Sequence, residues 1–149
     1  MIATATIDSI LKQKSSPLWS VSPDTTVFET IQLMAEKNIG AVLVKAGEKL
    51  VGIVSERDYT RKVALKGKSS KEMPVREIVS TPVITVGLNH TVEECMRLMT
   101  EHRIRHLPVL EGDRVAGVIS IGDLVNWVIS AQSVAIKQME NYIAGNYYC

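Results

Sequence analysis

The strongest constraint on this chain is an internal repeat. Residues 21–63 align with residues 86–128 without a gap, at a constant offset of about 65 residues. The coinciding pairs include Thr26/Thr91, Val27/Val92, Glu29/Glu94, Leu33/Leu98, Met34/Met99, Val44/Val109, Gly47/Gly112, Gly52/Gly117, Ser55/Ser120 and Asp58/Asp123. Two copies are too few for a solenoid, which needs about three to bury a continuous core. We therefore expect two halves packed with pseudo-twofold symmetry, with clefts that come in pairs.

Each copy has the same pattern of elements. Thr26 and Thr91 each stand three residues before a Glu, which predicts a capping box and a helix with an apolar stripe. Branched apolar runs at 39–44 and 104–109, then at 50–54 and 115–119, predict two hairpins whose turns lie at 46–49 and 111–114. Helical segments follow at 58–67 and 123–132. The predicted order within a repeat is strand, helix, strand, strand, helix.

Further helices are expected outside this repeated core. Short helices are expected at 7–14 and at 74–79, the latter opened by Pro74, and an exposed amphipathic helix is expected at 133–145. The polar linker at 66–71 separates the copies, so we divide the chain into residues 1–67 and 68–149. The fold class is α+β, with two βαββα subdomains.

The composition and charge of the chain disfavour several classes of function. The chain of 149 residues is 46% hydrophobic and 22% charged, which is typical of one folded domain or two small subdomains. Its 17 Lys and Arg residues nearly balance 16 Asp and Glu residues, which disfavours nucleic-acid binding. No long apolar run suggests a signal peptide or a membrane span, so we expect a cytoplasmic protein with no membrane partner. Cys95 and Cys149 have no metal-site or disulfide spacing and are expected to be inert.

A Ser-x-x-Asp sequence follows the second hairpin strand in both copies, as Ser55/Asp58 and Ser120/Asp123. One interpretation is a plain helix cap. The functional interpretation starts from location, because a helix N-terminus favours an anion such as phosphate. A carboxylate in the first turn can accept hydrogen bonds from the vicinal diol of ribose. Phosphate and diol together describe a nucleotide.

Neighbouring residues extend this hypothesis. Gly52 and Gly117 would let a flat base approach the strand, or would simply ease a twisted hairpin. Arg57 and Arg105 are the preferred candidates among the cations near the proposed clefts, which also include Arg61, Lys62, Arg103 and His106. The second copy has Arg105-His106-Leu107-Pro108 where the first has Gly40-Ala41-Val42-Leu43, so the two clefts should be chemically unequal. Pro108 cannot donate to a strand ladder, which leaves its neighbours' polar groups freer to face a ligand.

The sequence resembles the tandem CBS domain pair, or Bateman module, in its small stand-alone bacterial form. The likeness covers nearly the whole chain and rests on the motifs G-I-V-S-E-R-D and T-P-V-I-T-V, I-R-H-L-P-V, G-V-I-S-I-G-D. It implies two βαββα subdomains packed through their sheets, with two related clefts for adenine nucleotides such as AMP, ADP, ATP or NAD(H), and sometimes S-adenosylmethionine.

The resemblance also implies roles for particular residues. Ser55 and Ser120 would face phosphate or ribose, and Asp58 and Asp123 would face the ribose hydroxyls. Arg57, Arg105 and His106 fall where relatives place phosphate-contacting groups. Ser20 and Val21 in the first copy, like Thr85 and Val86 in the second, match the segment that borders the base.

The sequence leaves three functions open: a small enzyme, a regulatory nucleotide sensor and an interaction scaffold. No nucleophile with a base, carboxylate pair or metal-ligand set is arranged for catalysis, and neither phosphate-binding glycine motif occurs, so a small nucleotide-processing enzyme is the weakest. His102 and His106 straddle a predicted helix end and do not form a helical ligand pair, and His90 stands apart from both. A regulatory nucleotide sensor without catalysis is favoured, and the alternative is an interaction scaffold with vestigial clefts. Apolar terminal helices and the family's habit of pairing modules suggest a homodimer.

Overall fold

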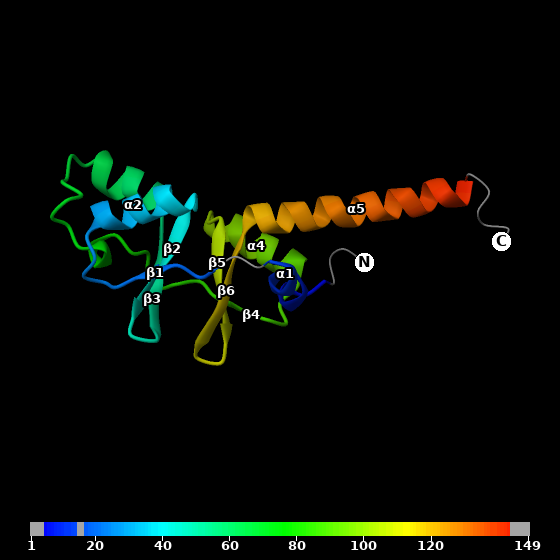
Figure 1. Ribbon diagram of the computed structural model, residues 1–149, viewed down its shortest axis with the longest axis horizontal. Coiled ribbons are helices and arrows are strands. Elements are labelled where there is room, and N and C mark those ends of the chain that lie inside the picture. The colour runs from blue at the N-terminus through cyan, green and yellow to red at the C-terminus, as the bar shows by residue number, and fades with distance from the viewer. Residues whose placement is uncertain (1–4, 15–16, 144–149) are drawn as a thin grey trace. The chain divides into compact units, whose positions relative to one another are not determined.

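The computed structural model describes residues 5–14 and 17–143 (Figure 1). Its elements are α1 (Ile7–Gln13), β1 (Ser20–Val21), α2 (Val27–Lys37), β2 (Ala41–Ala46), β3 (Lys49–Ser55), α3 (Glu56–Tyr59), a π turn (Thr60–Ala64), a 3₁₀ turn (Val75–Glu77), β4 (Val86–Gly87), α4 (Val92–His102), β5 (His106–Glu111), β6 (Arg114–Ser120) and α5 (Ile121–Ile143). Both copies of the repeat have the expected order of strand, helix, strand, strand, helix. The predicted α+β class is confirmed.

The first repeat builds a three-stranded sheet in the order β1-β2-β3. Strand β1 pairs in parallel with β2, which pairs antiparallel with β3 through a turn at Gly47, where φ is 63°. Glycine suits this turn because a left-handed φ carries no penalty there. The apolar faces of α2 and of the sheet share a core that includes Val27, Met34, Val44 and Val54.

The second repeat has a matching sheet in the order β4-β5-β6, and its hairpin turn at Gly112 has a φ of 64°. Helix α4 begins with a complete capping box, because Thr91 Oγ1 accepts from the Glu94 amide while the Glu94 carboxylate accepts from the Thr91 amide. The first repeat shows half of this arrangement, since Thr26 Oγ1 accepts from the Glu29 amide and the described contacts include no return bond. The predicted box at Thr26 is therefore corrected to a single cap.

The segment before each repeat pairs with the start of the helix in the other repeat. Ile7 N donates to His90 O and Val92 N donates to Ala5 O, both at 2.9 Å. In the same way, Val75 N donates to Thr25 O at 2.7 Å and Val27 N donates to Met73 O at 2.8 Å. The expected short helices are present, with Pro74 as the N-cap of its 3₁₀ turn instead of its first residue.

The chain forms two compact units, and each of them combines segments from both repeats. One contains α1, α4, α5 and the described parts of residues 87–107 and 119–143, and the other contains the described parts of 16–86 with 108–118. The N-terminal helix, which the sequence order groups with the first repeat, thus packs with elements of the second. The first unit also contains the start of β5 and the end of β6.

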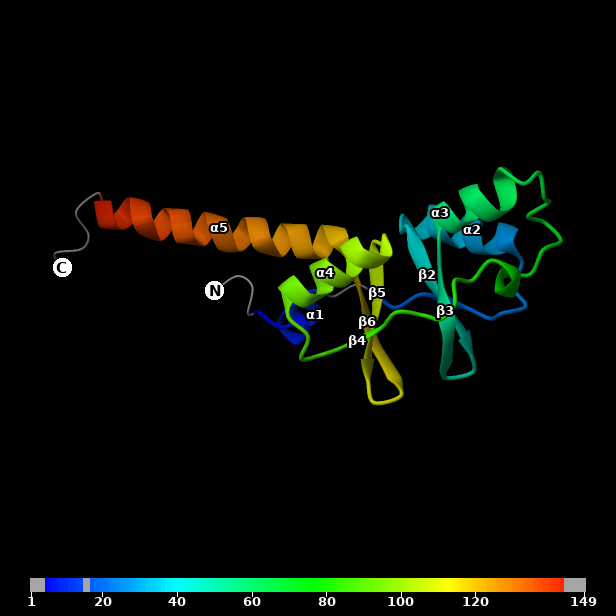
Figure 2. The ribbon, with the colours of Figure 1, turned by 180° about the vertical axis from the view of Figure 1, so that it is seen from behind.

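Two helices differ from the expectation. The segment predicted as one helix at 58–67 is a short α3 followed by a π turn, and the chain then turns at Gly67, where φ is 66°. The sequence predicts two separate helices at 123–132 and 133–145, but their described residues form one continuous helix, α5, which is unbroken in both views (Figures 1 and 2). No Gly or Pro interrupts residues 123–143, which explains the continuity. No described helix is long and apolar enough to cross a membrane.

Candidate functional site

The second Ser-x-x-Asp lies where β6 meets α5. Ser120 is the last residue of β6, and its amide donates to Asp123 Oδ2 at 2.9 Å. The Asp123 amide donates in return to Ser120 Oγ at 3.1 Å. These two bonds satisfy amides at the helix start, so the capping role of this pair is real. They also fix the carboxylate in one orientation.

A cation from another helix completes this junction. Lys14 Nζ, just after α1, lies 2.8 Å from Asp123 Oδ2, and the two side chains are only 28% and 23% exposed. Burial would raise the pKa of the Asp123 carboxyl, but the hydrogen bonds from Lys14 and from the Ser120 backbone outweigh burial and hold this pKa below its ordinary value. Asp123 is therefore an anion at neutral pH and an acceptor only.

His106 belongs to the same electrostatic group. It opens β5, and burial lowers its pKa, with further lowering from the charges of Lys14 and Arg105 and an opposing effect from Asp123. The imidazole is neutral at pH 7 as a result. The carbonyl of the exposed Arg105 accepts from the Ile121 amide at 2.8 Å, which joins this strand to the start of α5. The structure thus brings together four of the predicted residues: Arg105, His106, Ser120 and Asp123.

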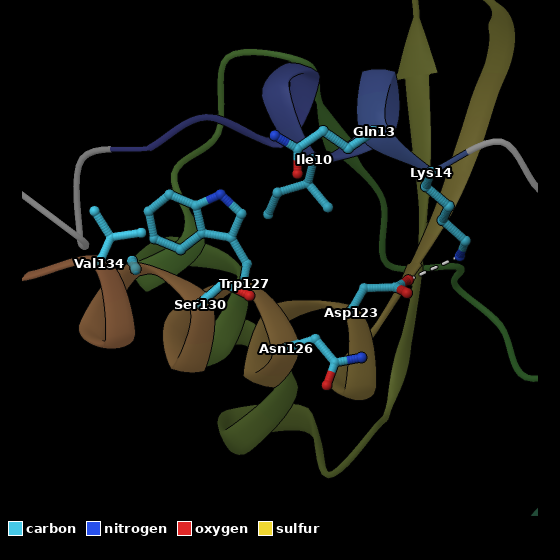
Figure 3. Close-up of a pocket in the computed structure, with 9 residues that line it drawn as sticks. Ile10, Gln13, Lys14, Asp123, Asn126, Trp127, Ser130 and Val134 are labelled. Carbon is cyan, nitrogen blue, oxygen red and sulfur yellow. Dashed lines mark hydrogen bonds and ion pairs between the residues drawn. The ribbon is translucent and has the colours of Figure 1, made fainter. Parts of the chain in front are cut away.

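A pocket of about 420 Å³ opens beside this group, between α1 and α5. The Lys14–Asp123 pair lines one end, and Trp127 and Ile10 point into the space (Figure 3). The remaining lining residues are Gln13, Asn126, Ser130, Ala131 and Val134. The pocket therefore combines an aromatic surface with an anion, a cation and two amide side chains.

The first Ser-x-x-Asp has the same cap but different surroundings. The Ser55 amide donates to Asp58 Oδ2 at 2.8 Å, and the Asp58 amide donates to Ser55 Oγ at 3.3 Å. Asp58 Oδ1 accepts from Ser80 Oγ at 3.2 Å and lies 3.3 Å from Lys62 Nζ. Lys62 also donates to Ile78 O at 2.9 Å and to Ser80 Oγ at 3.1 Å. The linker between the repeats therefore lies against this carboxylate.

The same linker explains Gly52. A Cβ at this position would collide with Cγ1 of Val79, and it would also contact the carbonyl of Ser80. Close approach of another backbone is one of the reasons for glycine within a strand. The group that approaches Gly52 here is the protein's own Val79.

The other predicted site residues lie in β1, α3, β4 and β5 or next to them. Ser20 and Val21 form β1 and pair with Leu43 and Val44 of β2, with Ser20 exposed and Val21 half-buried. Arg57 is exposed on α3. Thr85 is half-buried, whereas Val86 and Pro108 are buried in β4 and β5.

Sequence reasoning missed Lys14, Ser80 and Trp127 as residues near the two aspartates. No local pattern connects Lys14 to Asp123, which is 109 residues away. The repeat register relates position 62 to 127 and position 14 to 79. Beside Asp58 the lysine comes from position 62, whereas beside Asp123 it comes from position 14.

The other candidates for chemistry are the cysteines and possible metal ligands. Cys95 is a buried thiol, and burial, with the charge of Glu94, raises its pKa to about 11. Within residues 5–14 and 17–143, no cluster of His, Cys, Asp or Glu could hold a metal ion. Cys149 lies outside the described residues.

Two α+β repeats, each with a strand that ends in a serine capping the next helix with an aspartate, define a tandem-repeat module. The model of the CBS domain matches this chain twice, at residues 9–65 and 75–130. The chain belongs to the CBS domain family and is a small tandem CBS pair.

Relatives share this organisation. The chain is 38% identical over 154 residues to the CBS domain-containing protein CBSX3, mitochondrial, of Arabidopsis thaliana, covering 97% of this chain and 74% of that protein. A CBS-domain structure from Burkholderia ambifaria MC40-6 is 50% identical, with a TM-score of 0.82 over 86% of this chain and 96% of that one. A hexameric CBS-CP12 protein from bloom-forming cyanobacteria is 30% identical, with a TM-score of 0.73 over 82% of this chain and 67% of that one.

Proposed function

We propose that this CBS pair is a regulatory module that binds an adenine nucleotide at a Ser-x-x-Asp junction and catalyses no reaction. One observation carries the proposal: Asp123 is held by Ser120 as an oriented anion at the edge of a pocket, with Lys14 beside it. A fixed carboxylate suits the two hydroxyls of ribose, and an adjacent ammonium suits phosphate. AMP, ADP, ATP and NAD(H) all offer both groups.

The cationic side of the junction supports a phosphorylated ligand. Lys14 and Arg105 supply positive charge, and an anion near His106 would oppose the lowering of its pKa. A nucleoside without phosphate would leave these groups unused. We therefore expect nucleotides to bind more tightly than adenosine.

Regulation follows if the nucleotide prefers one arrangement of the two repeats. The ligand then shifts the population toward that arrangement, and coupling free energies of this kind are typically about 1 to 3 kcal/mol. A partner protein that contacts only one arrangement would respond to the nucleotide concentration.

A homodimer is the second part of the proposal, and α5 supports it. Exposed residues on α5 are spaced alternately by four and three positions, the spacing of a coiled-coil seam. This α5 seam consists of Val125, Ile129, Gln132, Ile136, Met139 and Ile143. Its five apolar members are between 41% and 76% exposed. The seam contains no charged residue and lies on the side of α5 opposite Trp127.

A second copy of the chain suits this seam. The stripe spans residues 125–143, which corresponds to about 27 Å of helix. Paired in parallel and in register, two copies would set Ile against Ile at three positions and would let the two Gln132 amides bond to each other. If the pocket were vestigial, this face would still serve an interaction scaffold, which is the alternative function.

A thermal-shift panel tests the proposal. AMP, ATP, NAD, NADH and S-adenosylmethionine are compared at millimolar concentration, with adenosine and inorganic phosphate as controls. A ligand at about 100 times its dissociation constant adds about 2.7 kcal/mol to stability, which gives a clear rise in melting temperature. No shift with any nucleotide would favour the scaffold. A cytoplasmic location remains a prediction that cell fractionation can check.

A further inference from the structure

The two repeats supply the cation beside their aspartates from different places. Position 62 in the first copy is equivalent to position 127 in the second, and position 79 is equivalent to position 14. At the first junction these positions hold Lys62 and Val79, whereas at the second junction they hold Trp127 and Lys14. The lysine and the apolar residue have therefore exchanged places between the two junctions. Each aspartate keeps a lysine, but the space around it differs.

The first junction is filled by the protein itself. Asp58 Oδ2 accepts from the amide and the hydroxyl of Ser55, at 2.8 and 3.2 Å. Asp58 Oδ1 contacts Ser80 Oγ at 3.2 Å and Lys62 Nζ at 3.3 Å. Both oxygens therefore have protein partners, and the side chain is only 16% exposed. Val79 takes up the space above Gly52, where a base would otherwise approach the strand.

The second junction opens onto a pocket. Ser120 N and Lys14 Nζ both contact Oδ2 of Asp123, at 2.9 and 2.8 Å. Both of these donors therefore converge on the same carboxylate oxygen. Asp123 lines the pocket of about 420 Å³, and Trp127, one turn further along α5, lines it as well. The position equivalent to Lys62 thus carries a tryptophan, whose ring lies along the pocket (Figure 3).

We propose that the chain binds one purine mononucleotide, at the second junction only, with the base stacked on Trp127. The inference rests on the proposed nucleotide binding and assigns its site, its stoichiometry and the size of its ligand. Asp123 accepts from the ribose hydroxyls, and Lys14 turns from Asp123 to the phosphate. Gln13 and Asn126 also line the pocket and carry amide side chains.

The pocket volume favours a small ligand. Small-molecule sites span about 300 to 1,000 Å³, and this pocket, at about 420 Å³, is near the lower limit. A single nucleotide suits that size better than a dinucleotide. AMP is therefore expected to bind more tightly than NAD(H), which must leave its second nucleoside outside.

Isothermal titration with AMP, together with tryptophan fluorescence, tests the assignment. Trp19 and Trp127 are the two tryptophans, so the fluorescence is measured in a Trp19→Phe background. We expect one AMP per chain and a fluorescence change on binding. Trp127→Ala should weaken AMP binding by about tenfold or more, as loss of base stacking does, and circular dichroism should show an unchanged fold.

The matched pair Asp123→Asn and Asp58→Asn locates the site. Asp123→Asn should weaken AMP binding at least tenfold, whereas Asp58→Asn should leave both affinity and stoichiometry unchanged. Two AMP per chain, or loss of binding in Asp58→Asn with Asp123→Asn unaffected, would overturn the single-site inference while leaving nucleotide binding intact. No binding of any nucleotide to the wild-type protein would overturn both proposals.

Discussion

Lys14 Nζ lies 2.8 Å from Oδ2 of Asp123, which ties the end of α1 to the first turn of α5 across 109 residues of sequence. Both side chains are largely shielded, so this ion pair is screened less by solvent than an exposed one. The pair therefore links the N-terminal helix to the capped junction.

Removing this cation should have two effects. Lys14→Met should lower the free energy of unfolding by about 1 kcal/mol, because one partner of a partly buried pair is lost. It should also weaken binding of AMP while leaving adenosine binding little changed. Urea unfolding and calorimetry measure these effects. Lys12→Met is the matched control on α1, because Lys12 is 76% exposed and pairs with Asp8 at the surface. An equal loss in both variants would contradict a special role for Lys14.

The neutral His106 predicts a pH dependence of stability. Burial lowers its pKa in the folded protein below the ordinary value of 6.5, so the unfolded chain binds this proton more readily. Stability should fall as pH decreases from about 6.5 through the folded-state pKa and should change no further from this group below it. Urea midpoints between pH 7.5 and 5 measure the slope, which His106→Gln should reduce. An unchanged slope in that variant would show that His106 is not the titrating group.

The contact between Gly52 and Val79 predicts a compensating pair of mutations. Gly52→Ala should destabilise the protein by about 1 to 3 kcal/mol, because the new methyl group collides with the Val79 side chain. Val79→Ala should relieve much of that loss when combined with it. A double-mutant cycle followed by urea unfolding measures the coupling. Additive losses would mean that Val79 does not set the requirement for glycine.

The buried Cys95 thiol should be unreactive. Its pKa of about 11 leaves very little thiolate at pH 8, and the side chain is fully covered. In a Cys149→Ser background, iodoacetamide should label the protein slowly when folded and rapidly in urea. Mass spectrometry follows both reactions. Fast labelling of the native protein would show that the α4 core opens readily.

The α5 seam predicts a change of oligomeric state. Ile136→Lys puts a charge in the middle of the apolar stripe, so a dimer joined there should dissociate. Gln138→Lys is the control, because Gln138 lies on the opposite side of the same helix and is also exposed. Light scattering at micromolar concentration should give a dimer for the wild type and for the control and a monomer for Ile136→Lys. A wild-type monomer would contradict the dimer proposal.

Local patterns allowed much of the fold to be predicted. The repeat register, the branched apolar runs and the turns at Gly47 and Gly112 gave the order of elements in both copies, because these depend on neighbouring residues. The caps at Ser55 and Ser120 were predictable for the same reason. Domain assignment is harder, because α1 pairs with residues 88–92 through bonds that no local pattern reports.

The surroundings of the two aspartates were less predictable. The contacts of Lys14 with Asp123 and of Ser80 with Asp58 join segments that are far apart in sequence. Likewise, the need for glycine at position 52 becomes clear only when Val79 is seen against it. The difference between Gly40-Ala41 and Arg105-His106 did indicate unequal sites, but the exchange of lysine and apolar residue around them required the structure.

A crystal structure of the protein grown with millimolar AMP tests the central claim most directly. The account predicts one AMP per chain in the pocket between α1 and α5, with both ribose hydroxyls within hydrogen-bond distance of the Asp123 carboxylate and the adenine ring against Trp127. An empty pocket at that concentration, or AMP bound only beside Asp58, would contradict it.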